Sequence, residues 1–436
     1  MLGFLLVAVV ALGVLGGVHW YVWRRLVRDV TARGSVSRRL GTGAAFVLPA
    51  LSVAALVSSR AGAPFWLQQV VAWPGYLWLA LLLYVTLALV VGEAVRPLLR
   101  RVLERRAAGQ APVAVQAPSP APAPATVPAT DSPVASPAET PADSAPQNPA
   151  ETPGADSGVT AVSRRLFVAR VVGGAAAAAA VGTVGYGTYG VLRGPRVKRV
   201  TVPLAKIPRA LHGYRIAVVS DIHLGPTLGR AHAQRIVDTI NSTQPDLIAV
   251  VGDMVDGTVE NLGSAAEPLA RLKARHGSFF VTGNHEYFSG ADAWVDHVRE
   301  LGMRPLRNER LEIAAGFDLA GVDDIAGESE GQGPDFAAAL GDRDRAKAAV
   351  LLAHQPIVID DAVRHGVDLQ LSGHTHGGQL WPGNYLAELA NPTVAGLERY
   401  GDTQLYVSRG AGAWGPPVRV GAPSDITVVQ LASKQA

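Results

Sequence analysis

Long apolar stretches and short apolar runs divide the chain into two halves with different patterns. The N-terminal half contains four stretches with almost no charge, at residues 2–23, 41–59, 73–95 and 166–192. About 20 apolar residues are enough to cross a bilayer as a helix. We therefore predict four transmembrane helices. Their few polar side chains are too sparse to indicate a transport pathway.

Arginines set the orientation that we predict for these helices. Six arginines follow the first stretch and five follow the third, whereas the loop between the second and third contains only Arg60. Cytoplasmic loops carry an excess of Lys and Arg. We therefore expect the N-terminus, and everything beyond the fourth stretch, outside the cytoplasm. Four basic residues beyond the fourth stretch oppose this orientation: Arg193, Arg196, Lys198 and Arg199.

A segment of biased composition separates the third apolar stretch from the fourth. Residues 108–162 are mostly Pro, Ala, Ser, Thr and Glu, which predicts a disordered, partly polyproline linker. The sequence SRRLF at 163–167 then precedes the fourth apolar stretch and resembles a twin-arginine export signal. Two arginines at this position also follow from the positive-inside rule alone. The export interpretation predicts the twin-arginine translocase as a partner.

From Tyr214 onward, short β-rich runs alternate with polar segments. The runs at 215–220, 247–251, 278–282, 348–353 and 367–371 are each followed by polar residues, and helix-like segments lie between the early runs, at 231–240 and 265–274. Such alternation predicts an α/β fold with sheets covered by helices. Sites in these folds form at the carboxyl ends of the strands.

The residues at these strand ends are metal-ligand types. Seven of them offer nitrogen or oxygen atoms: Asp221, His223, Asp253, Asn284, His354, His374 and His376. Because Asp221 and His223 are two residues apart, we expect them to share one face of an extended segment. Such ligands suit Mn, Fe or Zn better than Mg or Ca. Two divalent metal ions ~3.5–4 Å apart would activate a water and clamp the oxygens around a phosphorus.

The strand-end motifs D-x-H, G-D-x-x-D, G-N-H-E and G-H-T-H-G, together with His354, resemble the calcineurin-like metallophosphoesterase family. The resemblance covers about residues 200–431 and implies a four-layer αββα sandwich with a dinuclear metal centre. It assigns one metal to Asp221, His223, Asp253 and His376. It assigns the other metal to Asp253, Asn284, His354 and His374.

The resemblance also suggests a catalytic role for His285, which would contact the phosphate and protonate the leaving oxygen. The adjacent Glu286 is expected to orient this imidazole and raise its pKa. Protein phosphatases of the superfamily carry Arg-Gly after the second Asp of G-D-x-x-D, whereas Asp256 is followed here by Gly257. The G-H-T-H-G-G-Q ending and the membrane anchor instead resemble a bacterial branch of exported or membrane-associated phosphodiesterases.

Composition narrows the classes of function. Only 17% of the 436 residues are charged, against about 25% in soluble proteins, which excludes a purely soluble chain. The net charge of +3 comes from arginines beside apolar stretches, since 20 basic residues oppose 28 acidic ones after residue 200. We therefore predict no nucleic-acid partner. The absence of Cys excludes disulfides, thiolate metal sites and Cys nucleophiles.

We predict four regions: three spans at 1–107, the linker at 108–162, the signal and fourth span at 163–199, and a metallophosphoesterase domain at 200–436. The domain is predicted to be extracytoplasmic on a multi-pass cell-membrane protein and to hydrolyse a phosphodiester, with its location favouring a lipid- or cell-envelope-linked substrate. The alternatives are a phosphomonoesterase or a non-catalytic membrane sensor or scaffold. Trp381 and Trp414 form either a lipid-facing rim or a packed surface, and we expect packing.

Overall fold

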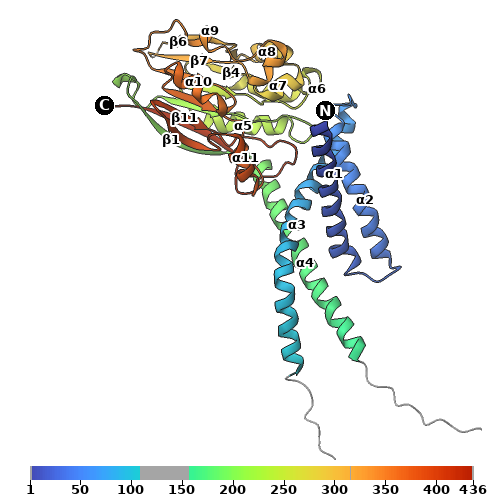
Figure 1. Cartoon of the computed structure of the whole chain (residues 1–436). Coiled ribbons are helices and arrows are strands. Elements are labelled where there is room, and N and C mark those ends of the chain that lie inside the picture. The colour runs from blue at the N-terminus through green and yellow to red at the C-terminus, as the bar shows by residue number, and fades with distance from the viewer. Residues whose placement is uncertain (1, 109–156, 315, 435–436) are drawn as a thin grey trace, which may run out of the picture.

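The computed structural model describes residues 2–108, 157–314 and 316–434 and shows a bundle of helices below a domain with two sheets (Figure 1). The helices are α1 Leu2–Trp23, α2 Val36–Val57, α3 Phe65–Ala108 and α4 Ser157–Leu192. Three of them, over residues 36–57, 65–106 and 164–192, have the length and apolar composition needed to cross a membrane. Most of the predicted linker lies outside the described residues.

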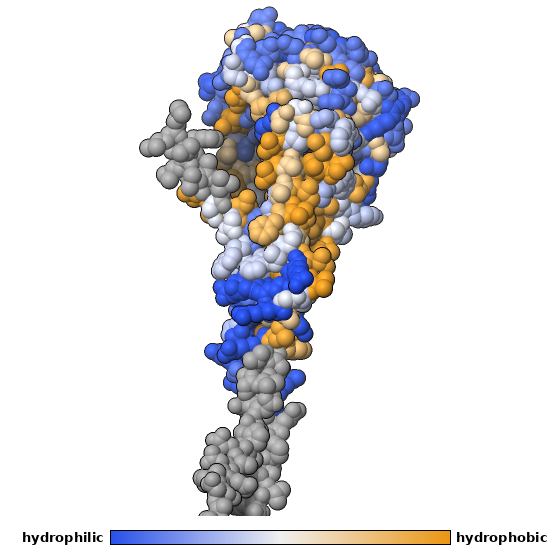
Figure 2. Space-filling model, turned by 90° about the vertical axis from the view of Figure 1, so that its right-hand side faces the viewer, coloured by the Kyte–Doolittle hydropathy of each residue, from blue (hydrophilic) through white to orange (hydrophobic). Residues whose placement is uncertain are grey.

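The bundle has a charged end and an end that contacts the domain. At the charged end, Arg25 Nε lies 2.9 Å from Glu93 Oε1, and Arg96 contacts the same carboxylate at 3.2 Å. The domain and the start of α1 lie at the other end (Figure 1). The helices have a hydrophobic surface that ends in a hydrophilic band (Figure 2). The topology, including the membrane side that each end faces, remains a prediction.

The domain contains two six-stranded sheets. The first has the order β1 (Arg196–Leu204), β12 (Asp425–Ser433), β2 (Arg215–Val219), β3 (Leu247–Val251), β4 (Ser278–Val281) and β5 (Arg304–Pro305). The second has the order β10 (Gly396–Tyr400), β11 (Thr403–Val407), β9 (Leu369–Ser372), β8 (Ala349–Leu352), β7 (Phe317–Gly321) and β6 (Glu309–Ile313). Strands β2 to β5 are parallel, as are β7, β8, β9 and β11.

The central strands of both sheets are buried on both faces, which explains why they are almost continuously apolar. Along β2, Ile216 and Val218 pack between the sheets, whereas Ala217 and Val219 point to the helices α5 (Arg230–Ser242), α6 (Val259–Ala266) and α8 (Ala291–Glu300). Helices α9 (Phe336–Leu340) and α10 (Ile359–Arg364) cover the second sheet. The predicted α/β class and the four-layer αββα sandwich are therefore confirmed.

Two predicted segments differ in detail from the structure. The helix expected at 265–274 is instead α6, which ends at Ala266, followed by a 3-10 turn, Glu267–Arg271. Pro268 favours this change because its ring removes a backbone donor. The domain boundary drawn at residue 200 falls inside β1, which begins at Arg196 because it pairs with β12 from its first residue.

Candidate metal centre

The loops that carry the predicted ligands meet at one edge of the sandwich, since they leave the carboxyl ends of parallel strands. Eight non-glycine residues of the described chain have a left-handed backbone, and five are predicted ligands: Asp221 (φ 52°), His223 (49°), Asp253 (52°), His374 (73°) and His376 (53°). Such residues cost ~1–3 kcal/mol each and cluster at functional sites. The expectation of an extended segment was therefore wrong: Asp221 and His223 are brought together by tight turns.

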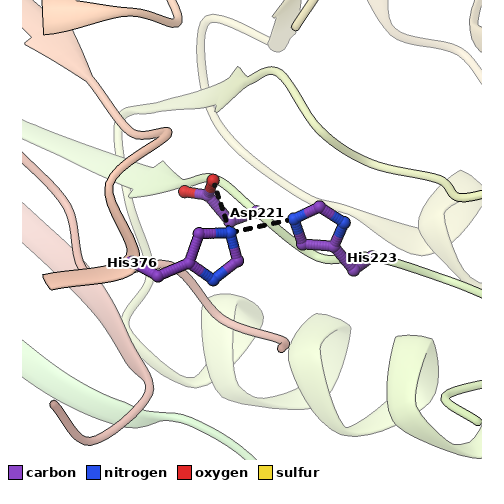
Figure 3. Close-up of side chains that lie close together, drawn as sticks. All are labelled: Asp221, His223 and His376. Atoms are coloured by element: carbon purple, nitrogen blue, oxygen red, sulfur yellow. Dashed lines mark hydrogen bonds and ion pairs between the residues drawn. The ribbon is translucent and has the colours of Figure 1, made fainter. Parts of the chain in front are cut away.

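One group of ligand atoms comes from the loops after β2 and β9 (Figure 3). His376 Nε2 lies 3.3 Å from Asp221 Oδ1 and 3.0 Å from His223 Nε2. All three side chains are nearly inaccessible to solvent. The group contains three of the four ligands that the family resemblance assigns to the first metal.

A second group lies beside the first and is formed by Asp253, His354 and His374. His354 Nε2 is 3.1 Å from Asp253 Oδ2, and His374 Nδ1 is 3.0 Å from Asn284 Oδ1. Asp253 Oδ2 is also 3.8 Å from His223 Nε2 in the first group. The carboxylate of Asp253 therefore lies between the two groups.

The donor atoms fit divalent cations. Within each group the candidate ligand atoms lie within 4.8 Å of one another. His354 Nε2 is buried without a hydrogen-bond partner among the described residues, although it faces a carboxylate. Burying an imidazole nitrogen or a carboxylate costs free energy unless a partner provides compensation for the lost hydration. Divalent cations would supply this compensation, since nitrogen and oxygen atoms are ligands that they prefer.

The neighbouring carboxylates and imidazoles of the site shift one another's pKa values. Burial by itself would lower the pKa of His223, but Asp256 and Asp253 outweigh it and raise the pKa to about 9. Burial and the charge of His354 lower the pKa of His374 to about 4. Metal ligands must be neutral imidazoles, so a cation would displace the proton from His223.

The partner of His285 is Asp256, not Glu286 as predicted. His285 Nδ1 lies 2.7 Å from Asp256 Oδ1, which also lies 2.8 Å from His223 Nδ1. Burial by itself would raise the pKa of Asp256, but His223 and His285 together lower it to about 2. An ionised Asp256 can therefore orient both imidazoles. The motif G-D-x-x-D contains this residue and was the signal that could have identified it.

Glu286 holds the backbone of the neighbouring loops instead. It is fully buried at the start of α7 (Asn284–Ser289) and accepts hydrogen bonds from the amides of Gly283, Met254 and Asp253 at 2.6, 2.7 and 2.9 Å. Burial raises the pKa of Glu286 to about 7. The side chain turns back toward the helix start because it sits three residues after the cap, the position of a capping box. This contact fixes Asp253 relative to Asn284.

A pocket of about 990 Å³ opens from the metal-ligand groups. The side chains that line it include His285, Phe288 and Trp414, and also Arg60 and Leu83 from the helical bundle. The two bundle residues were not predicted as part of the site. The expectation that the tryptophans are packed was wrong, since Trp381 and Trp414 are 49% and 54% exposed.

The fold and this site define a metallophosphoesterase, and comparison with known proteins agrees. Residues 214–378 match the family described as Calcineurin-like phosphoesterase. The chain is similar to an uncharacterized metallophosphoesterase of Aquifex aeolicus, at 36% identity over 243 residues that cover 55% of this chain and 92% of the relative. The uncharacterized metallophosphoesterase YkuE of Bacillus subtilis is 30% identical over 285 residues, 62% of this chain and 98% of that protein. This chain belongs to the metallophosphoesterase family.

A third relative shares the combination of membrane helices and this domain. The "transmembrane protein with metallophosphoesterase domain" of Danio rerio is 40% identical over 264 residues, which cover 58% of this chain. The match spans 60% of the length of the Danio rerio protein.

Proposed function

We propose that this chain is a membrane-anchored phosphodiesterase that uses two divalent cations. The observation that carries the proposal is the position of Asp253, which lies between two groups of ligand atoms and beside His285 in one pocket. When bound, the cations would activate a water and stabilise the charge on the phosphoryl oxygens. Water adds to phosphorus, the bond to the leaving oxygen breaks, and that oxygen takes a proton, which yields a phosphomonoester and an alcohol.

His285 is the proposed donor of that proton. Its backbone amide donates to Asp253 Oδ1 at 2.9 Å, and its Nδ1 is held by Asp256. The other ring nitrogen, Nε2, is then available to a substrate in the pocket that His285 lines. A histidine whose tautomer is fixed by a carboxylate is suited to acid catalysis.

Apart from the proposed cations, the side chains of the pocket favour a diester over a monoester. Arg60 is the only lysine or arginine among the described residues that line it. A phosphodiester carries one negative charge, whereas a phosphomonoester carries close to two at neutral pH and needs more compensation. The alternatives remain a phosphomonoesterase and a binding-only sensor, and both differ from the proposal in a direct assay.

Hydrolysis by the purified full chain should require metal and favour a diester. With Mn²⁺ in detergent, we expect kcat/KM for butyl p-nitrophenyl phosphate to exceed that for p-nitrophenyl phosphate by at least about tenfold, because the pocket compensates one charge better than two. Treatment with EDTA should remove the activity, and added Mn²⁺ should restore it. A preference for the monoester would support the first alternative. Metal binding without hydrolysis of either compound would support the sensor.

We also propose that the domain reaches the outside through the twin-arginine translocase. Replacing both Arg164 and Arg165 by Lys keeps the positive charge, so topology set by charge alone is unaffected. We expect this variant to leave the domain protected from protease added to spheroplasts, as in cells that lack the translocase. The matched control is the same exchange at Arg105 and Arg106, which should leave the domain accessible. An accessible domain in the Arg164/Arg165 variant would contradict this route.

A further inference from the structure

The membrane helices form part of the wall of the catalytic pocket. Leu83 lies within α3, and Arg60 lies in the turn between α2 and α3, yet both line the same pocket as His285 and His374. Arg60 has no acidic side chain within ion-pair distance among the described residues. A cationic and an apolar side chain from the helical region therefore line the pocket that contains the proposed metal centre.

The rim of the pocket is apolar and exposed. Helix α11 (Gly383–Ala390) has no buried residue and carries one charge, Glu388. Tyr385 and Leu386 on this helix line the pocket and are 58% and 71% exposed, and Leu389, further along the same helix, is 84% exposed. Phe288, from α7, adds an apolar side chain that is 70% exposed. So many large apolar side chains around one pocket mark a surface that contacts something other than water.

This rim lies at the depth of the membrane helices. The loop that leads into α11 packs on the bundle, where the Tyr84 hydroxyl donates to the Trp381 carbonyl at 2.9 Å and Leu380 joins the apolar cluster of α3 and α4. Figure 1 shows α11 on the side of the domain from which α4 enters. The rim and the bundle surface are therefore continuous.

The contacts of α4 indicate how close the domain lies to the bilayer. A Cβ atom at Gly187 would lie 2.7 Å from Val418 Cγ1, so the loop of Val418 touches the helix there. Arg193 is the first charge after Arg170, and Gly187 precedes it by six residues, or roughly 9 Å along the helix. The loop beside α11 thus contacts the uncharged stretch of α4. Apolar faces of interfacial helices enter the bilayer boundary by ~5–10 Å.

We propose that the pocket opens into the membrane interface and takes a phosphodiester that carries a long hydrocarbon chain. This inference rests on the proposed function and adds the class of substrate. The hydrocarbon chain would lie in the bilayer along Leu386 and Leu83, and the phosphate would reach the metal-ligand groups. Arg60 would face its negative charge. The occupant is a lipid because the rim is continuous with helices that meet the bilayer.

The test compares two substrates with the same reacting group. Butyl and hexadecyl p-nitrophenyl phosphate differ in the hydrocarbon chain alone, and both release p-nitrophenol. With the full chain in phosphatidylcholine nanodiscs and Mn²⁺, we expect kcat/KM for the hexadecyl ester to exceed that for the butyl ester by at least about tenfold. Equal rates would overturn the inference and leave the proposed function in place. Hydrolysis of neither ester would overturn both.

Substitutions on α11 test whether this helix causes the preference for the hexadecyl ester. The double substitution Leu386→Glu and Leu389→Glu should lower the hexadecyl-to-butyl ratio at least about fivefold, because charge opposes insertion. The ratio is measured within each variant, so loss of folded protein cancels. The matched control Val363→Glu lies on α10 and replaces a side chain that is 37% exposed; it should keep the wild-type ratio. An unchanged hexadecyl-to-butyl ratio in the double variant would overturn the inference. If the double variant changed only the oligomeric state, the inference would also be overturned, and α11 would instead be assigned to contact with a second copy of the chain.

Discussion

Replacing Asp253 by Asn should reduce kcat/KM for butyl p-nitrophenyl phosphate by at least about 10³-fold. The proposed metal ligands act as one catalytic unit, so the loss of one ligand should disable the whole site. The Asp253 carboxylate lies between the two groups of ligand atoms and contacts His354 at 3.1 Å. An amide has the same shape but lacks the negative charge that would attract the proposed cations. We expect the metal content of the purified variant, measured by mass spectrometry, to fall with the activity.

The control for this variant is the same chemical change far from the site. Asp342 pairs with Arg310 at the surface and its side chain is 84% exposed. Asp342→Asn should keep kcat/KM within about twofold of the wild-type value, as most surface substitutions do. Full activity and full metal content in the Asp253 variant would refute the assignment of the site.

Replacing His285 by Asn should slow hydrolysis strongly when the leaving group is basic. For a phenyl ester we expect a loss in kcat of ~10²–10⁴, the usual contribution of general acid catalysis. The loss should be much smaller for p-nitrophenyl esters, because p-nitrophenolate leaves readily without a proton. The dependence of the loss on the leaving group is therefore the measurement that identifies His285 as the acid.

The metal content of the His285 variant distinguishes a role as the acid from a role as a metal ligand. His285 lies close enough to His223 and Asp253 to serve as a ligand. If it is the acid, the variant should keep its metal ions; loss of metal together with equal losses for both leaving groups would contradict the proposal. His212→Asn, at an exposed position outside the site, is the control and should change neither quantity.

Much of the domain was predictable because its central strands are buried on both faces. The continuous apolar runs at β2, β3 and β4 mark such strands directly. The polar residues that follow them must then lie at one edge of the sheet. This pattern alone predicts that Asp221, Asp253 and Asn284 lie together. The roles of these residues as ligands remain predictions.

The partners of these residues were harder to predict, because sequence proximity does not decide which carboxylate reaches which imidazole. Glu286 is adjacent to His285 in sequence, but on the first turn of α7 it points back to the amides of the preceding loop. Asp256 lies 29 positions earlier and reaches His285 from the loop after β3. The backbone conformation at the start of α7 therefore determines which carboxylate contacts His285.

The contribution of the bundle was also not predictable from the pattern of apolar residues. Apolar stretches give the length of a membrane helix but not its neighbours. Arg60 lies in a loop between two apolar stretches, and nothing in its surroundings in the sequence indicates a pocket formed with residues such as His285. Trp381 and Trp414 likewise gave no indication of whether they were packed, since both alternatives require the same residue type.

The shared wall at Arg60 and Leu83 has a practical consequence for work on this family. An excised domain that starts near β1 would expose to solvent a face that the intact chain covers with protein. Inhibitors selected against such a fragment would be fitted to a wider opening than the one that exists in the cell. Screening for ligands therefore belongs on the intact, reconstituted enzyme.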